Sequence, residues 1–331
     1  MLIVNQQVSE RSMLGDPDGI NKVRRSYTED ELLHYFEREK GSKDFRGKEI
    51  LLHLDSFCVG DTVCFARFIE PFIEYSGASK VFITTFFPDF FYSDDPRIQF
   101  IPATSPNLML EIDTHINVGY DKADPNHTIG GLFYAARDSM GLPQHINPGK
   151  SFMKYRKSSR QPKKIVIAPE SLKKIARWDF PGGWQRVVDH FIQKGYQIYN
   201  VSYEDYIKLD GVINYNGFND INVAIGHILE ASVFVGLSSG LAWISWDYNI
   251  PTVLISGFTK DHNEFPCYRV SNRFGCNGCF NVIPQVLNSC PMFYGTERQN
   301  ECHNRFITPE MVIQKIEQAI FENQIPVTPS L

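Results

Sequence analysis

The sequence predicts an α/β protein with two doubly wound parallel sheets. Short apolar runs alternate with longer segments of helical spacing, and this alternation occurs in both halves of the chain. The apolar runs are nearly continuous, which is typical of parallel strands covered on both faces. The chain has 331 residues, of which 43% are hydrophobic and 21% are charged, so it is long enough to bury two globular cores.

The first half begins with an irregular polar segment, residues 1–45, which holds one helical candidate at 28–39. We expect the first domain at residues 46–150, and a run rich in Pro, Ser, Lys and Arg at 142–164 as the linker. In this domain the pattern predicts strands at 49–55, 80–86, 97–101 and 114–120, with helices at 62–75 and 128–140.

The second domain, residues 151–331, repeats the alternation. Thr308 and Pro309 mark the start of its last helix, as the N-cap and the first helical residue. The pattern predicts strands at 164–168, 197–201, 211–215, 233–236 and 252–256, with helices at 183–194, 219–231, 240–248 and 309–323.

Five of the seven cysteines lie between residues 267 and 302, and four of them predict a metal site. Cys276 and Cys279 form a CxxC knuckle, and Cys290 and Cys302 would complete a tetrahedral shell suited to zinc or iron. Disulfides and unliganded thiols are the alternatives. Cys267 is expected outside the shell.

The expected compartment favours the metal site over the disulfides. The N-terminus lacks the basic flank and apolar core of a signal peptide, and no stretch is apolar enough to span a membrane, so we expect a cytoplasmic protein. Reducing conditions favour thiolate ligands over disulfides. Cys58 and Cys64 are expected to be ordinary buried thiols. The net charge of −5 argues against nucleic acid as a partner.

Gly60, Asp61 and Thr62 stand where the first predicted strand gives way to a helix. Gly60 allows close approach to the backbone, and a helix N-terminus favours an anion. Asp61 would act there as a general base that takes a proton from an acceptor hydroxyl. The alternative is a carboxylate that only caps the helix.

The segment Gly236-Leu-Ser238-Ser239-Gly240 joins a strand to a helix and has three interpretations. As an anion cradle, its backbone N–H groups and two serine hydroxyls would hold a pyrophosphate. As a G-x-S-x-G nucleophile elbow, it would make Ser238 the nucleophile of a serine hydrolase, with His262 or His303 as the base. The third interpretation is a plain turn of small residues.

Two further loops of the second domain carry candidate donor-binding residues. Lys174 and Arg177 would offset the charge of a diphosphate leaving group, and Trp178 would pack on a base or sugar face. A solvated basic loop is the alternative. Polar residues that follow the strand at 252–256 would also bind the donor, in part through sugar or ribose hydroxyls: Thr259, Asn263 and Glu264.

Two facing doubly wound domains form a cleft for a donor and an acceptor, which is the architecture of GT-B glycosyltransferases. From about residue 49 onward the chain resembles the bacterial autotransporter O-heptosyltransferases, which are relatives of the lipopolysaccharide heptosyltransferases of glycosyltransferase family 9. The segments that carry the resemblance are 60–62, 177–184, 234–243, 253–259, 263–265, 268–270, 276–280, 289–291, 295–302 and 307–309.

The resemblance implies an inverting enzyme that moves heptose from ADP-heptose, or a related nucleotide sugar, to Ser or Thr hydroxyls of an autotransporter or adhesin passenger protein. Asp61 would be the base, with Gly60 and Thr62 beside it. Ser238, Ser239 and Gly240 would hold the diphosphate. Residues 46–150 would form the acceptor side, and residues 151–331 the nucleotide-sugar side, with the metal segment at 267–305.

The resemblance also implies structural Fe³⁺ at the four cysteines, with zinc as the alternative, and no cofactor in the chemical step. It implies a homo-oligomer as large as a dodecameric ring. The chain departs from the family pattern at Ala176, where the family has a lysine. A catalytically inactive module that binds nucleotide sugars is therefore a further alternative, besides the serine hydrolase.

Overall fold

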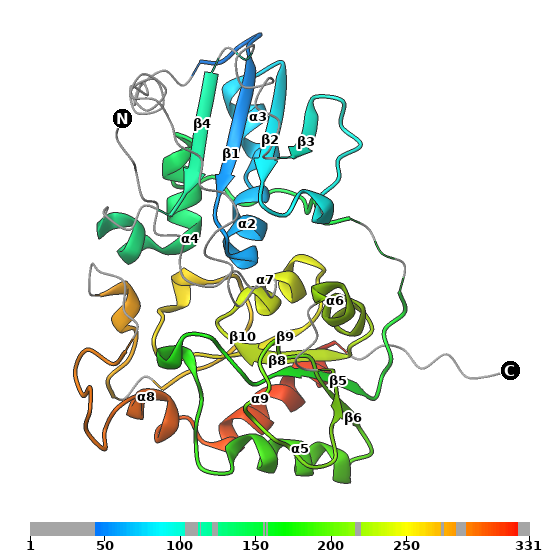
Figure 1. Cartoon of the computed structure of the whole chain (residues 1–331), viewed down its shortest axis with the longest axis vertical. Helices are drawn as coiled ribbons and strands as arrows, with labels where there is room; N and C mark the ends of the chain where they lie inside the picture. Colours follow the sequence, from blue (N-terminus) through cyan, green and yellow to red (C-terminus); the bar gives the residue numbers. More distant parts are fainter. Residues whose placement is uncertain are drawn as a thin grey trace, which may run out of the picture. The chain divides into compact units, whose positions relative to one another are not determined.

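The structure is a computed structural model that describes residues 44–102, 112, 114–120, 125–154, 156, 158–215, 220–272, 275–282 and 289–323 (Figure 1). The helix predicted at 28–39 lies outside these residues. The chain divides into two compact units. Unit 1 comprises Met1–Asp121 and Leu132–Lys154, and unit 2 comprises Lys122–Gly131 and Tyr155–Leu331.

The core of unit 1 is a parallel four-stranded sheet with the order β3-β2-β1-β4. Its central strand contributes four almost fully buried aliphatic residues, Ile50, Leu51, Leu52 and Leu54, which is why its apolar run was readable in the sequence. The bounds are β1 Glu49–Asp55, β2 Lys80–Thr85, β3 Ile98–Pro102 and β4 Thr114–Gly119.

The helices of unit 1 differ from the prediction of one helix at 62–75. Two helices occupy this region, α2 Val59–Ala66 and α3 Ile69–Ser76, and α2 begins three residues earlier than predicted. Pro71 in the first turn of α3 has no N–H to donate to the Arg67 carbonyl, which accepts from Gly149 N at 2.6 Å instead. A further helix, α4 Pro125–Ser139, is interrupted at Gly131, where φ is 76° and ψ is −174°; only the part after Gly131 belongs to unit 1.

Unit 2 contains a parallel six-stranded sheet with the order β10-β9-β8-β5-β6-β7. The prediction of two parallel α/β sheets is therefore confirmed. The strand β10 was not predicted from the sequence, because only three residues form it. The bounds are β5 Lys164–Ala168, β6 Gln197–Asn200, β7 Ile213–Asn214, β8 Val233–Leu237, β9 Thr252–Ile255 and β10 Tyr268–Val270.

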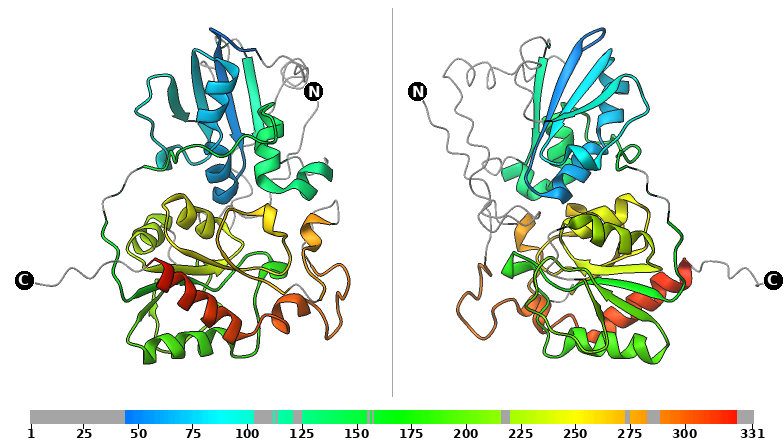
Figure 2. Two further views of the ribbon diagram at one scale, coloured as in Figure 1. Left: turned by 180° about the vertical axis from the view of Figure 1, so that it is seen from behind. Right: turned by 45° about the vertical axis from the view of Figure 1, so that its right-hand side comes forward.

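Helices cover both faces of this sheet (Figures 1 and 2). The helices α6 Ile221–Leu229 and α7 Gly240–Asp247 lie on one face, and α5 Gly183–Gln193 and α9 Pro309–Glu322 lie on the other. Of the described helices, none is both long and apolar enough to cross a bilayer. Short helices fill the loops: η1 Pro88–Phe90, η3 Lys174–Ala176, η4 Asp261–Asn263, η5 Cys279–Asn281 and α8 Glu301–Asn304.

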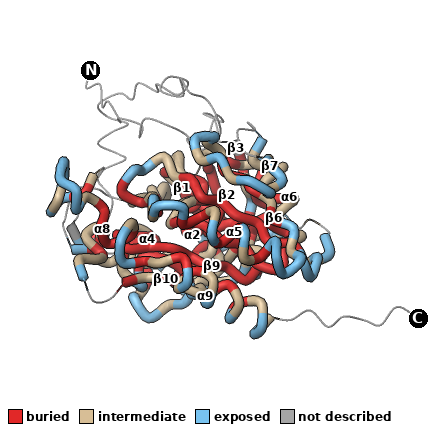
Figure 3. The backbone as a smooth tube through the Cα atoms, turned by 90° about the horizontal axis from the view of Figure 1, so that it is seen from below, coloured by how far each residue is buried: buried red, intermediate tan, exposed pale blue. Residues whose placement is uncertain are grey.

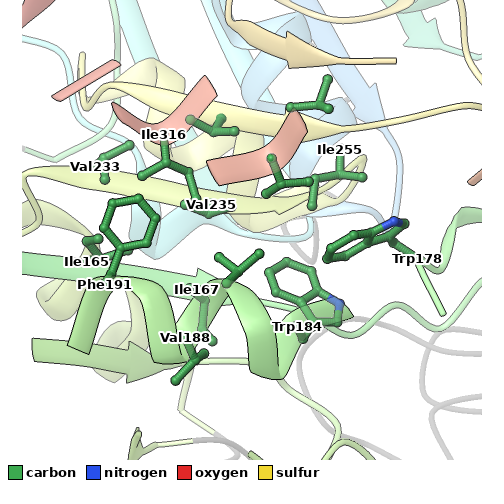
Figure 4. Close-up of a cluster of buried hydrophobic side chains, with 14 of the residues drawn as sticks. Ile165, Ile167, Trp178, Trp184, Val188, Phe191, Val233, Val235, Ile255 and Ile316 are labelled. Carbon is green, nitrogen blue, oxygen red and sulfur yellow. The ribbon is translucent and has the colours of Figure 1, made fainter. Parts of the chain in front are cut away.

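The main core of unit 2 lies between the sheet and the pair α5 and α9 (Figure 4). Strand residues such as Ile167 and Val235 meet Phe191 of α5 and Ile316 of α9 there. Figure 3 shows the central strands as mostly buried, in agreement with their exposures. Trp178 belongs to this core, although it lies in a loop.

The strand order of each sheet locates its switch point. In unit 1 the order reverses between β1 and β4, and in unit 2 between β5 and β8. In open parallel sheets, ligands bind outside the carboxyl ends of the strands at such points. The loops after β1, β5 and β8 are therefore the first places to look for a site.

Candidate functional site

Asp61 lies in the first turn of α2, just beyond the carboxyl end of β1. Its Oδ2 accepts a hydrogen bond of 2.9 Å from the Ser56 hydroxyl. That hydroxyl oxygen accepts from Cys58 N at 3.0 Å, so its proton is directed to the carboxylate. The Asp61 side chain is half-buried, which leaves part of the carboxylate accessible.

Gly60 does not lie in a loop before the helix as predicted, because α2 already begins at Val59; Thr62 lies in the helix, as expected. Thr62 is fully buried, and its hydroxyl is within hydrogen-bonding distance of the carbonyls of Ser56 and Cys58. Gly60 is buried as well. Their place in the fold indicates that they hold the start of α2 against the end of β1, rather than contacting a donor.

The second candidate is the turn Ser238–Gly240, which follows β8 at the switch point of unit 2. Ser239 is the N-cap of α7 in extended conformation, and its side chain makes no capping bond. The Ser238 hydroxyl donates to Glu264 Oε1 at 2.6 Å. Its proton is thus committed to a carboxylate, which leaves the first N–H groups of α7 and the Ser239 hydroxyl as the donors for an anion.

Glu264 is held in a buried ion pair. Its side chain is 0% exposed, and its Oε2 lies 2.6 Å from Arg269 Nη1, whose side chain is 10% exposed. Arg269 also donates through Nη2 to the carbonyl and the hydroxyl of Thr259, at 2.9 and 2.8 Å. A buried carboxylate needs such partners, because leaving it unpaired would cost several kilocalories per mole.

Asn263 and Glu264 were predicted to bind the donor, but both are almost fully buried, at 5% and 3% exposure. The Asn263 amide donates to Glu264 Oε1 at 3.1 Å, and its Oδ1 accepts from Asn281 Nδ2 at 2.9 Å. These bonds connect the two residues to the protein rather than to a ligand. We therefore correct their expected role from donor contact to support of Ser238.

A polar cavity of about 460 Å³ opens at the carboxyl ends of β9 and β10. Of the three residues predicted in this loop, only Thr259 lines it, and its hydroxyl is shared with Ser256 Oγ at 2.5 Å. Residues of two loops form most of the wall: Thr259, Lys260, Asp261, His262, Ser271 and Asn272.

The geometry does not support the serine hydrolase. The Ser238 hydroxyl bonds to a carboxylate, whereas the triad requires a histidine. His262 Nε2 bonds to the Ile129 carbonyl instead. Both ring nitrogens of His303 are engaged by the backbone, with Gly257 N at 2.8 Å and the Arg177 carbonyl at 2.9 Å.

The basic loop after β5 holds its predicted residues in different ways. Trp178 is 0% exposed, and its indole N–H donates to the Ile307 carbonyl at 2.8 Å (Figure 4). The prediction that it stacks on a base or sugar is therefore wrong in this structure. The Arg177 guanidinium lies 4.1 Å from the Tyr206 ring centroid and donates to the Ser171 carbonyl. Lys174 is exposed and presents a cation to solvent.

Burial and neighbouring thiols raise the pKa of two of the predicted metal cysteines. Burial, followed by the neighbouring Cys276 and Cys290 thiols, raises the pKa of Cys279 to about 11. Burial and the other three thiols raise the pKa of Cys302 to about 12. None of the four is in a disulfide, and Phe293 N donates to Cys290 Sγ at 3.3 Å. Within the described ranges, however, no three His, Cys, Asp or Glu side chains are arranged to hold a metal.

Sequence reasoning missed Arg269 and Asn281. Arg269 lies in β10, and Asn281 lies two residues after Cys279, at the end of η5. Both residues act through side-chain hydrogen bonds to residues elsewhere in the chain. The spacing of residues along the sequence does not predict such bonds.

The comparisons with known proteins fit this fold. No protein-family model matches the chain. The autotransporter heptosyltransferase Aah of Escherichia coli is 27% identical over 289 residues, which are 81% of this chain and 73% of Aah. The autotransporter heptosyltransferase TibC of E. coli O78:H11 is 30% identical over 181 residues, which are 50% of this chain and 44% of TibC. The inactive autotransporter heptosyltransferase BimC of Burkholderia thailandensis is 31% identical over 168 residues, 46% of this chain and 39% of BimC.

Among solved structures, the chain is similar to TibC, described as a dodecameric iron-containing heptosyltransferase in complex with ADP-D-beta-D-heptose. The TM-score is 0.74 at 23% identity, and the match covers 85% of this chain and 78% of that chain. This likeness supports the GT-B-like fold. The sequence relatives are autotransporter heptosyltransferases, and this similarity supports a glycosyltransferase.

Proposed function

We propose that the protein transfers heptose from ADP-heptose to Ser or Thr hydroxyls of an autotransporter passenger protein, with inversion at the anomeric carbon. The observation that carries the proposal is the similarity to Aah over 81% of the chain. The complex of TibC with ADP-heptose supports the donor, because TibC shares this fold.

Asp61 acts as the general base in this proposal. It takes the proton of the acceptor hydroxyl while the oxygen attacks the anomeric carbon, and the ADP leaves from the opposite face. The bond from Ser56 fixes the carboxylate for this task. A positioned base of this kind contributes roughly 10²–10⁴-fold to the rate.

The diphosphate is bound by the Ser239 hydroxyl and the first N–H groups of α7. The positive end of the helix dipole and the exposed Lys174 offset the charge that develops on the leaving group. No cofactor takes part in the chemical step.

We also propose that Cys276, Cys279, Cys290 and Cys302 hold one structural iron ion, with zinc as the alternative. Neighbouring thiols help to raise the pKa of Cys279 and Cys302, and the four cysteines form a donor set that suits either metal. The name of the TibC structure supports iron. It also supports a homo-oligomer. Thiolate ligands need reducing conditions, which the cytoplasm provides.

The test incubates the purified protein with ADP-heptose and a fragment of an autotransporter passenger, followed by intact-mass spectrometry. The expected result is a series of mass increments of one heptosyl residue, with release of ADP. The same reaction without the passenger fragment is the control for donor hydrolysis. A protein that binds ADP-heptose but modifies no passenger would contradict the proposed activity.

A further inference from the structure

The cysteine knuckle, defined here as residues 276–281, is bonded to the loop that follows β9. Gly278 N donates to the Gly257 carbonyl at 2.8 Å, and Phe280 N donates to the Phe258 carbonyl at 2.9 Å. Gly278 is the knuckle's turn residue, with a φ of 66°. The path of the loop after β9 is therefore fixed by the knuckle.

Asn281 ends the knuckle and is 4% exposed. Its Oδ1 accepts from Lys260 N at 2.8 Å, and its Nδ2 donates to the Thr128 carbonyl and to Asn263 Oδ1, both at 2.9 Å. The orientation of the amide is determined, because one side faces an N–H group and the other faces two oxygens. All of these partners belong to unit 2.

The path continues from Asn263 to Ser238. The Asn263 amide donates to Glu264 Oε1, and the same oxygen accepts the Ser238 hydroxyl proton at 2.6 Å. Arg269 holds the other oxygen of Glu264. Four side chains thus connect the knuckle to the turn before α7: Asn281, Asn263, Glu264 and Ser238.

We propose that Asn281 is a positioning residue that couples the cysteine knuckle to the Ser238–Gly240 turn. It acts by fixing Asn263, which fixes the carboxylate that orients the Ser238 hydroxyl. The inference rests on the proposed function, in which this turn binds the diphosphate of the donor. The cysteine segment would then contribute to the affinity for the donor, in addition to stabilising unit 2.

Asn281→Ala removes two donated bonds and one accepted bond but leaves all four cysteines in place. We expect ADP to bind roughly tenfold more weakly by calorimetry, since the turn loses its orientation. The donor KM rises accordingly, and kcat stays within about twofold because Asp61 is untouched. Asn323→Ala is the matched control: its amide also donates two bonds, to the Ala319 carbonyl and Tyr268 Oη, at the end of α9. It should leave ADP affinity unchanged.

A double-mutant cycle separates coupling from general loosening. Ser238→Ala should also weaken ADP binding, and the double variant with Asn281→Ala should be little weaker than either single variant. If the two substitutions act independently, so that their losses of binding free energy add in the double variant, the proposal is overturned. Asn263→Ala interrupts the same path outside the knuckle, so it keeps the test open if Asn281→Ala does not fold. An unchanged ADP affinity in Asn263→Ala would likewise overturn it.

The proposed function fails in a different way. If the unmodified protein binds no ADP, the donor assignment is wrong before any variant is compared. If the unmodified protein binds ADP and the double-mutant cycle shows no coupling, the proposed donor site is retained and the proposed role of Asn281 is rejected.

Discussion

Asp61 is the residue on which the proposed chemistry depends most directly. Asp61→Asn keeps an oxygen that can accept the Ser56 hydroxyl but removes the group that takes up a proton. We expect kcat to fall by roughly 10²–10⁴-fold, while ADP affinity stays within about twofold. Rate measurements and calorimetry check this. Asp89→Asn, at an exposed carboxylate of the same unit, is the control, and undiminished turnover in Asp61→Asn would remove Asp61 from the mechanism.

Substitution of Trp178 tests whether its side chain stabilises the core or contacts a ligand. Trp178→Phe leaves the buried Ile307 carbonyl without its donor and creates a small void, so we expect the free energy of unfolding to fall by about 2–4 kcal/mol. ADP affinity should not change. Trp184→Phe is the matched control, because the Trp184 indole N–H has no hydrogen-bond partner among the described residues. A variant of Trp178 with normal stability and weakened ADP binding would restore the stacking role.

At the scale of elements, the alternation of strands and helices was predictable because each apolar run is local. The strand at Glu49–Asp55 and the strand at Lys164–Ala168 coincide with their predicted ranges. The break between α2 and α3 was missed, although Pro71 signals it by lacking an N–H group. Its structural consequence appears only when Gly149 takes the Arg67 carbonyl, and that contact spans 82 positions of sequence from 67 to 149.

The candidate site was predictable only in part, because many of its contacts join residues that lie far apart in the sequence. The turn at Ser238–Gly240 was visible as small residues after a strand. The burial of Glu264, its bond to Ser238 and its pairing with Arg269 depend on how the loops after β8 and β9 meet strand β10. A sequence pattern shows that a residue is polar, but not whether its partner is a ligand or another buried side chain.

His303 makes the attachment of α8 sensitive to pH. Burial lowers its pKa from the ordinary 6.5 to about 4, and the neutral ring satisfies both of its backbone partners. The unfolded chain binds a proton below about pH 6.5 and the folded chain does not until about pH 4. This contribution to stability is therefore complete above pH 6.5 and declines as the pH falls, by up to about 3 kcal/mol.

Urea unfolding between pH 7.5 and pH 4.5 measures this decline. His303→Gln keeps an acceptor for Gly257 N but cannot be protonated, so its stability should fall less steeply with decreasing pH. The comparison concerns slopes and not absolute stability, because the variant also loses the bond to the Arg177 carbonyl. Equal slopes for the two proteins would exclude His303 as the source.

The cysteine segment is expected to carry about one iron ion per chain by elemental analysis. Cys279→Ser and Cys302→Ser should lower the metal content sharply, and Cys267→Ser should not. Because burial and neighbouring thiols raise the pKa of Cys279 and Cys302, metal uptake must release protons and should strengthen as the pH rises. Metal content unaffected by both serine variants would rule out the four-cysteine site.

For the whole molecule, we expect assembly beyond the single chain of 38.0 kDa. Two large side chains of the cysteine segment, Met292 and Tyr294, are 64% and 71% exposed, and an interface with another chain would bury such residues. Light scattering after size-exclusion chromatography should give a mass several times that of one chain. A mass of one chain across a hundredfold range of concentration would contradict the proposed oligomer.

Gly257 shows how closely the loop after β9 packs against α8. Its backbone is not in the left-handed region, so conformation alone would permit any residue. A Cβ there would nevertheless stand 2.3 Å from His303 Cδ2 and 2.8 Å from His303 Nε2. In a library of all single substitutions, Gly257 should therefore tolerate not even alanine, while Gly226, with open space around it, should accept many side chains. The tolerance of these two glycines to substitution would then depend on the room around a Cβ atom and not on the backbone conformation.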